Sequence, residues 1–132
     1  MGLVIDSSVL IAVERRKLDF SQLELDQPIY ISSITVTELL IGASRSNTED
    51  RRIKRAAFVE HIINMIATID FGVEEARIYA QILHNLYIEN ITLGTHDVII
   101  GACAIANGHS VITLNGRDFN RIKGLEIVMV KT

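Results

Sequence analysis

The sequence predicts an α/β fold: a single domain over residues 1–132 with a central, mainly parallel sheet of about five strands and helices on both faces. Short apolar runs of strand length alternate along the chain with longer segments that have helical periodicity. Strands joined by helices run parallel, and helices then cover both faces of the sheet. With 132 residues and 48% hydrophobic composition, the chain is long and apolar enough to bury one core.

The first part of the chain predicts two strands, each followed by a helix. Residues 3–5 are apolar at every position, as in a strand that is buried on both faces. A short helix is expected over residues 9–13, and the basic residues 15–17 would complement the negative end of its dipole. A second strand is expected at residues 29–31 and a second helix from about 34 to 44.

The middle of the chain predicts two long helices on either side of a short strand. Asn47-Thr48 opens the first helix, which carries at helical spacing Phe58, Ile62, Ile63 and Ile66. Residues 68–70 are expected to form the short strand. The second helix covers residues 73–89, and its apolar stripe consists of Val73, Ala76, Ala80, Leu83 and Tyr87.

The last part of the chain predicts one buried helix and two strands. Residues 98–106 are apolar on every side, so this helix should be deeply buried. Asn107-Gly108 ends it, as glycine commonly does just past a helix. Strands are expected at residues 111–114 and 125–130.

Composition favours a cytoplasmic protein that does not enter a membrane. Cys103 is the only cysteine, which excludes an internal disulfide and fits a reducing compartment, and its small apolar neighbours indicate a core position. No signal-peptide hydrophobic region precedes Asp6. The longest apolar run, residues 98–106, is too short to span a bilayer.

The charge of the chain bears on its partners. A net charge of −3 differs from the basic character that is typical of nucleic-acid-binding domains. Two basic clusters, at residues 15–17 and within residues 51–55, partly offset this balance. Each cluster also fits a solvated helix face.

Acidic side chains follow the predicted strands. Asp6 comes directly after the first strand, and Glu38 lies in the helix after the second. Asp97 opens the buried helix, and Asn115 and Asp118 follow the strand at residues 111–114. Functional groups of parallel sheets gather beyond the carboxyl ends of the strands, so these side chains are expected to meet at one sheet edge.

Each acid taken singly also has a structural interpretation. Asp6 fits the N-cap of the first helix, and Thr35-x-x-Glu38 matches a capping box. Asp97 fits the positive end of its helix, and Asp118 fits a cap of the turn before Arg121. These interpretations do not explain why acids recur at a single edge of the sheet.

A cluster of carboxylates at this edge predicts a divalent cation. Two like charges at about 4 Å repel by roughly 4 kcal/mol at an effective dielectric constant of about 20. A site with oxygen ligands and no His or Cys suits Mg²⁺ or Mn²⁺. His61, His84 and His109 lack the spacing of zinc ligands, and the chain has no phosphate-binding glycine loop. A haloacid-dehalogenase phosphatase would need a second Asp where Ser8 stands.

Four motifs in order resemble the PIN-domain family, especially its VapC toxins. They are residues 3–11 (LVIDSSVLI), 32–42 (SSITVTELLIG), 97–102 (DVIIGA) and 111–119 (VITLNGRDF), and together they span nearly the whole chain. The resemblance implies a PIN-like domain with Mg²⁺- or Mn²⁺-dependent endoribonuclease activity.

The resemblance also implies roles for individual residues. Asp6 and Asp97 would be the main catalytic metal ligands, and Glu38 would bind the metal directly or through water. Asp118 would complete the acidic site, with Asn115 as the alternative at this fourth position. Ser7 stands where the family commonly has Thr and keeps the hydroxyl.

The implied partners are an RNA substrate, a VapB-type antitoxin whose C-terminal segment lies across the cleft, and a second copy of the chain in a homodimer. Two alternatives remain open at the level of sequence. One is a PIN-type nuclease of RNA maturation outside a toxin–antitoxin system, and the other is a non-catalytic PIN-like scaffold that acts in a protein complex.

Overall fold

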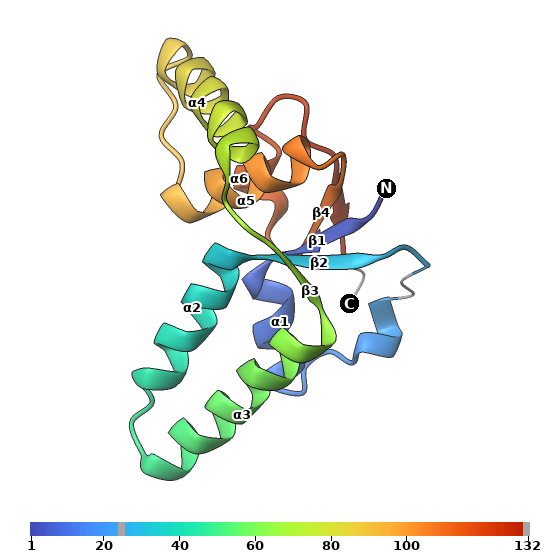
Figure 1. The fold of residues 1–132 in the computed structure, drawn as a ribbon, viewed down its shortest axis with the longest axis vertical. Coiled ribbons are helices and arrows are strands. Elements are labelled where there is room, and N and C mark those ends of the chain that lie inside the picture. Colours follow the sequence, from blue (N-terminus) through green and yellow to red (C-terminus); the bar gives the residue numbers. More distant parts are fainter. Residues whose placement is uncertain (24–25, 131–132) are drawn as a thin grey trace.

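The computed structural model describes residues 1–23 and 26–130, arranged in three layers (Figure 1). The middle layer is a sheet of five strands in the order β3-β2-β1-β4-β5, and every neighbouring pair is parallel. The strands are β1 (Leu3–Ile5), β2 (Ile29–Ser32), β3 (Ala67–Ile69), β4 (Ser110–Thr113) and β5 (Ile127–Met129). The predicted α/β class and the five parallel strands are confirmed.

Strand order creates a switch point at the centre of the sheet. From β1 the chain builds outward through β2 and β3, then returns to the other side of β1 to add β4 and β5. In open parallel sheets a crevice forms beyond the carboxyl ends of the strands at such a switch point. The crevice between β1 and β4 is therefore where the topology places a functional site.

Two hydrophobic clusters lie on the two faces of the sheet because successive side chains of a strand point in opposite directions. Leu3, Ile5 and Ile112 belong to the first cluster. Val4 and Val111 belong to the second. The continuous apolar runs of β1 and β4 thus reflect burial on both faces, as the sequence predicts.

Three helices accompany the first cluster and form the lower part of Figure 1. They are α1 (Ser7–Glu14), α2 (Ser33–Ser44) and α3 (Glu49–Met65), and a 3₁₀ turn lies at Phe20–Leu23. Thr48 caps α3 by accepting a hydrogen bond from the backbone N–H of Arg51 at 3.2 Å. The α2 and α3 pair projects from the sheet as a hairpin (Figure 1).

The other three helices accompany the second cluster. They are α4 (Val73–Ile88), α5 (Thr95–Ala106) and the short α6 (Gly116–Phe119). Helix α5 is buried along most of its length, and Cys103 is a core residue of it, as predicted. No helix in residues 1–23 and 26–130 is long and apolar enough to cross a membrane.

The apolar stripe predicted for α4 lies on the exposed side of the helix, so this prediction is wrong. Its members Val73, Leu83 and Tyr87 are exposed, Tyr87 at 82%. The buried side of α4 carries Ile82 and Leu86 instead. Both sides of this helix bear apolar residues at helical spacing, so periodicity alone selected the side that the core does not use.

Candidate active site

Four acids lie beyond the carboxyl ends of the strands, as the sequence predicts. Asp6 follows β1 directly, and Glu38 lies in α2 after β2. Asp97 is in the first turn of α5, and Asp118 is in α6 after β4. Burial of Asp97 raises the pKa of its carboxyl to about 6, with further contributions from the charges of Asp6, Asp118 and Glu38. Asp97 therefore lies near enough to the other three acids for their charges to act on it.

Two hydroxyl groups hold Asp6 in place. Ser8 Oγ donates a hydrogen bond to Asp6 Oδ2 at 2.7 Å, and Thr113 Oγ1 donates to the same oxygen at 2.9 Å. Asp6 is only 5% exposed, so these donors replace the water that the buried carboxylate loses. Both bonds converge on Oδ2, which leaves Oδ1 as the oxygen that the two hydroxyls do not engage.

The same hydroxyls fix the loop after β4. Ser8 Oγ accepts a hydrogen bond from the backbone N–H of Leu114 at 3.2 Å. Thr113 Oγ1 accepts one from the N–H of Asn115 at 2.9 Å. Asn115, the predicted alternative at the fourth position, is the N-cap residue of α6, so this network ties Asp6 to the start of the helix that carries Asp118.

Sequence reasoning did not identify Ser8 and Thr113 as supports of Asp6. It named Ser7, which is the first residue of α1 and lies next to Ser8. Ser8 and Thr113 are 105 positions apart in the chain, so their partnership depends on the pairing of β1 with β4. The only local signal was the position of each hydroxyl close to a strand end.

We expect Thr113→Val to weaken the site without unfolding the protein. Valine has the shape of threonine but cannot donate to Asp6, and outer-shell partners of metal ligands typically affect metal affinity or activity by about 10- to 100-fold. Thr113→Ser keeps the hydroxyl and should retain most of the function. Mn²⁺ affinity and circular dichroism of both variants check this expectation, and an unchanged affinity in Thr113→Val would contradict it.

Glu38 lies within reach of His96, to which the sequence assigns no role. His96 Nδ1 is 3.3 Å from Glu38 Oε2. The other oxygen, Oε1, is buried and has no hydrogen-bond partner in the described part of the chain. The capping-box interpretation of Glu38 is wrong, because Ser32 is the N-cap residue of α2 and its hydroxyl accepts from the N–H of Ile34.

The donor set suits a hard divalent cation. A buried carboxylate oxygen without a donor costs free energy unless a cation or water meets it, and Glu38 Oε1 is such an atom. Within residues 1–23 and 26–130 the side chains do not form a ready-made group of three metal ligands. Mg²⁺ tolerates this arrangement because it keeps several waters and binds through only one or two carboxylates.

Comparison with known proteins identifies the family of the chain. The family described as PIN domain matches residues 3–125. The chain is 48% identical over 132 residues to Ribonuclease VapC1 of Rickettsia felis, which covers all of this chain and 98% of that protein. It is 35% identical over 97 residues to a tRNA(fMet)-specific endonuclease VapC of Salmonella typhimurium, covering 74% of this chain and 71% of that one.

A solved structure shows the same fold. The VapBC2 complex of Rickettsia felis bound to a DNA fragment from its promoter contains a chain that superposes with a TM-score of 0.90. The alignment covers 99% of this chain and all of that one at 24% identity, so it shows the fold alone. Together with the family match and the full-length relative, these findings show that the chain belongs to the PIN-domain family, in its VapC ribonuclease branch.

Proposed function

We propose that the chain is an endoribonuclease that depends on Mg²⁺ or Mn²⁺ and hydrolyses RNA phosphodiester bonds as the toxin of a VapBC-type pair. The observation that supports this most directly is the shared acidic site. Burial, together with the charges of Asp6, Asp118 and Glu38, raises the pKa of Asp97 to about 6, and a bound cation would offset this cost of the ionised carboxylate.

The residues of the acidic site would have different roles. Asp6 and Asp97 would hold the ion, Glu38 would bind it directly or through water, and Asp118 or Asn115 would complete the site. When bound, the ion supplies an activated water and neutralises charge that builds on the phosphate. The chain itself keeps Asp6 oriented through Ser8 and Thr113, so little reorganisation is needed when RNA arrives.

Initiator tRNA is the first substrate to test, because the Salmonella relative is named as specific for tRNA(fMet). A VapB-type antitoxin is the proposed partner, supported by the VapC name of the full-length relative and the VapBC complex that shares the fold. Its C-terminal segment would cover the acidic site. The proposed location is the cytoplasm, where its RNA substrate is found.

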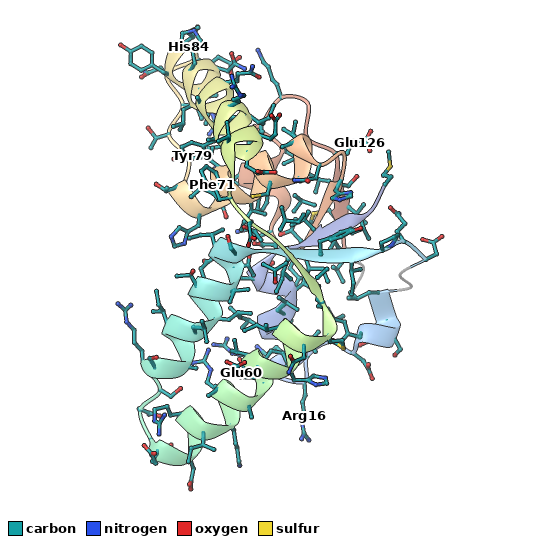
Figure 2. All side chains as sticks on the ribbon, viewed as in Figure 1. Arg16, Glu60, Phe71, Tyr79, His84 and Glu126 are labelled. Atoms are coloured by element: carbon teal, nitrogen blue, oxygen red, sulfur yellow. The ribbon has the colours of Figure 1, made fainter. Side chains whose placement is uncertain are left out.

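A homodimer is part of the proposal. The exposed side of α4 carries Val73, Leu83, Tyr87 and Ile88, the last at 66% exposure. Figure 2 shows His84 on the same helix, at the end far from the sheet. Exposed apolar side chains that gather on one helix often mark a protein interface.

The direct test incubates the purified chain with initiator tRNA and with elongator tRNAs. We expect cleavage in Mg²⁺ or Mn²⁺ and none in EDTA. Restoring the metal after EDTA should restore cleavage, which separates metal dependence from irreversible unfolding. Equal cleavage in EDTA and in Mg²⁺ would contradict the proposed mechanism.

A further inference from the structure

A basic groove lies at the ends of α1 and α2 that are remote from the acids. It has a volume of about 880 Å³ between the end of α1, the α2–α3 turn and the first half of α3. Six cationic side chains line it against one carboxylate, that of Glu14: Arg15, Arg16, Arg45, Arg51, Lys54 and Arg55. The two basic clusters of the sequence thus meet at one place in the fold.

Two of these cationic side chains, those of Arg55 and Arg51, form contacts that support the fold. Arg55 Nη1 donates to the backbone carbonyl of Gly42 at 2.7 Å, and its Nε lies 3.4 Å from Glu14 Oε2. Arg51 donates to Asn47 Oδ1 at 3.0 Å. These contacts join α3 to α1, to α2 and to the α2–α3 turn, so they shape the groove, and Glu14 offsets part of its positive charge.

The other four cationic side chains of the groove remain available to bind an anion. Arg15, Arg16, Arg45 and Lys54 are exposed, and none forms an ion pair within the residues that the structure describes. Arg16 points away from the sheet in Figure 2. Four like charges around one groove, in a chain whose net charge is −3, create a local positive field that attracts an anion.

The groove lies at the C-terminal ends of α1 and α2, whereas Asp6 precedes α1 and Glu38 lies near the middle of α2. Helix α1 begins directly after Asp6 and ends at Glu14, next to Arg15. Helix α2 carries Glu38 and ends just before Arg45, seven positions later, which is about 10 Å at 1.5 Å per residue. A nucleic-acid strand of a few nucleotides spans this distance.

We infer that this groove binds the sugar–phosphate backbone of the RNA substrate on one side of the cleaved bond. The inference rests on the proposed function, which places RNA at the acids, so the strand need only continue along α1 and α2. Half-buried Phe58 in the groove offers an aromatic face for an unstacked base. An acidic protein segment is the alternative occupant, and assays of tRNA binding and of inhibition by the antitoxin distinguish it from RNA.

Arg45→Gln combined with Lys54→Gln tests the groove, and Arg77→Gln combined with Arg121→Gln is the matched control. Both pairs remove two positive charges from exposed positions that form no ion pair within residues 1–23 and 26–130, and Arg77 lies on α4, on the other side of the sheet. Arg55 stays in place because it supports the fold. Binding of fluorescently labelled bulk tRNA is measured by anisotropy in EDTA over a range of salt concentrations, and cleavage is measured separately.

The groove variant should bind tRNA about fivefold more weakly at low salt, and the slope of log Kd against log salt should fall by about 1.4 to 1.8 for two lost phosphate contacts. In cleavage, KM should rise while kcat stays within about twofold, because the groove acts in binding and not in chemistry. The control variant should match the wild-type protein in both assays.

Wild-type Kd and salt slope in the groove variant would overturn the inference, even if the protein cleaves RNA. Weaker inhibition by the antitoxin with unchanged tRNA binding would also overturn it and would assign the groove to the protein partner. If no RNA is cleaved but tRNA binding depends on the groove, the inferred RNA binding by the groove is supported and the proposed nuclease function is contradicted.

Discussion

Asp97→Asn should lower tRNA cleavage by about 1,000-fold while making the metal-free protein more stable. The asparagine keeps the shape of the side chain but removes a charge that would bind the proposed ion. It also removes a charge that burial, Asp6, Asp118 and Glu38 all disfavour in the folded state. Loss of activity together with a gain in stability separates a functional role from a folding defect.

The stability gain has a defined pH dependence. In the unfolded chain Asp97 loses its proton near pH 3.8, and in the folded chain only near pH 6. Between these values the folded state binds more protons than the unfolded state, so the stability of the wild-type protein falls as pH rises. Asparagine does not titrate, and the difference in Tm should therefore grow from pH 4 to pH 6 and then stay constant.

The expected gain is about 1 to 2 kcal/mol at pH 7. The full shift corresponds to about 3 kcal/mol, and partial exposure of the carboxylate reduces this through solvent screening. Thermal unfolding in EDTA measures it, with Asp70→Asn as a control on an exposed acid. A lower Tm of Asp97→Asn at pH 7, or unchanged cleavage, would contradict the role assigned to this residue.

Phe119→Ala should cost about 3 to 5 kcal/mol of folding free energy. Phe119 is 1% exposed and belongs to the second hydrophobic cluster, in the four-residue helix α6. So short a helix has no stability of its own, and packing of Phe119 holds it in place. Because α6 also carries Asp118, cleavage should fall along with stability.

Urea unfolding followed by circular dichroism measures this effect. Phe119→Leu fills more of the space and should cost clearly less than Phe119→Ala. A loss below about 1 kcal/mol in Phe119→Ala would mean that α6 is held by other contacts.

The centre of the sheet could be predicted from the sequence because strands β1 and β4 are buried on both faces. Their continuous apolar runs, separated by helical segments, indicate a parallel sheet, whereas the edge strands β3 and β5 are largely exposed. Helix α6 was not predicted because its four residues, from Gly116 to Phe119, are too few to show periodicity. Helix α4 was predicted with the wrong buried side, since the choice between its two apolar sides depends on where α5 packs.

The acids of the site were predictable for a similar reason. A parallel sheet brings the carboxyl ends of its strands to one edge, so Asp6 and Asp97 could be placed together before any coordinates. The support of Asp6 by Thr113 depends on two residues 107 positions apart and on the register of β1 with β4. The basic groove likewise needed the α2–α3 hairpin to bring Arg45 and Lys54 toward Arg15.

Titration of Mn²⁺ into the metal-free protein by calorimetry tests the central claim most directly, since it asks whether the four carboxylates form a cation site without requiring the correct RNA. The wild-type protein should bind Mn²⁺ with saturable heat, and Asp6→Asn and Asp97→Asn should lose this binding while remaining folded by circular dichroism. Asp70→Asn should bind as the wild-type protein does. Equal Mn²⁺ binding by all four proteins would contradict the account, because the ion would then bind somewhere other than the acidic site.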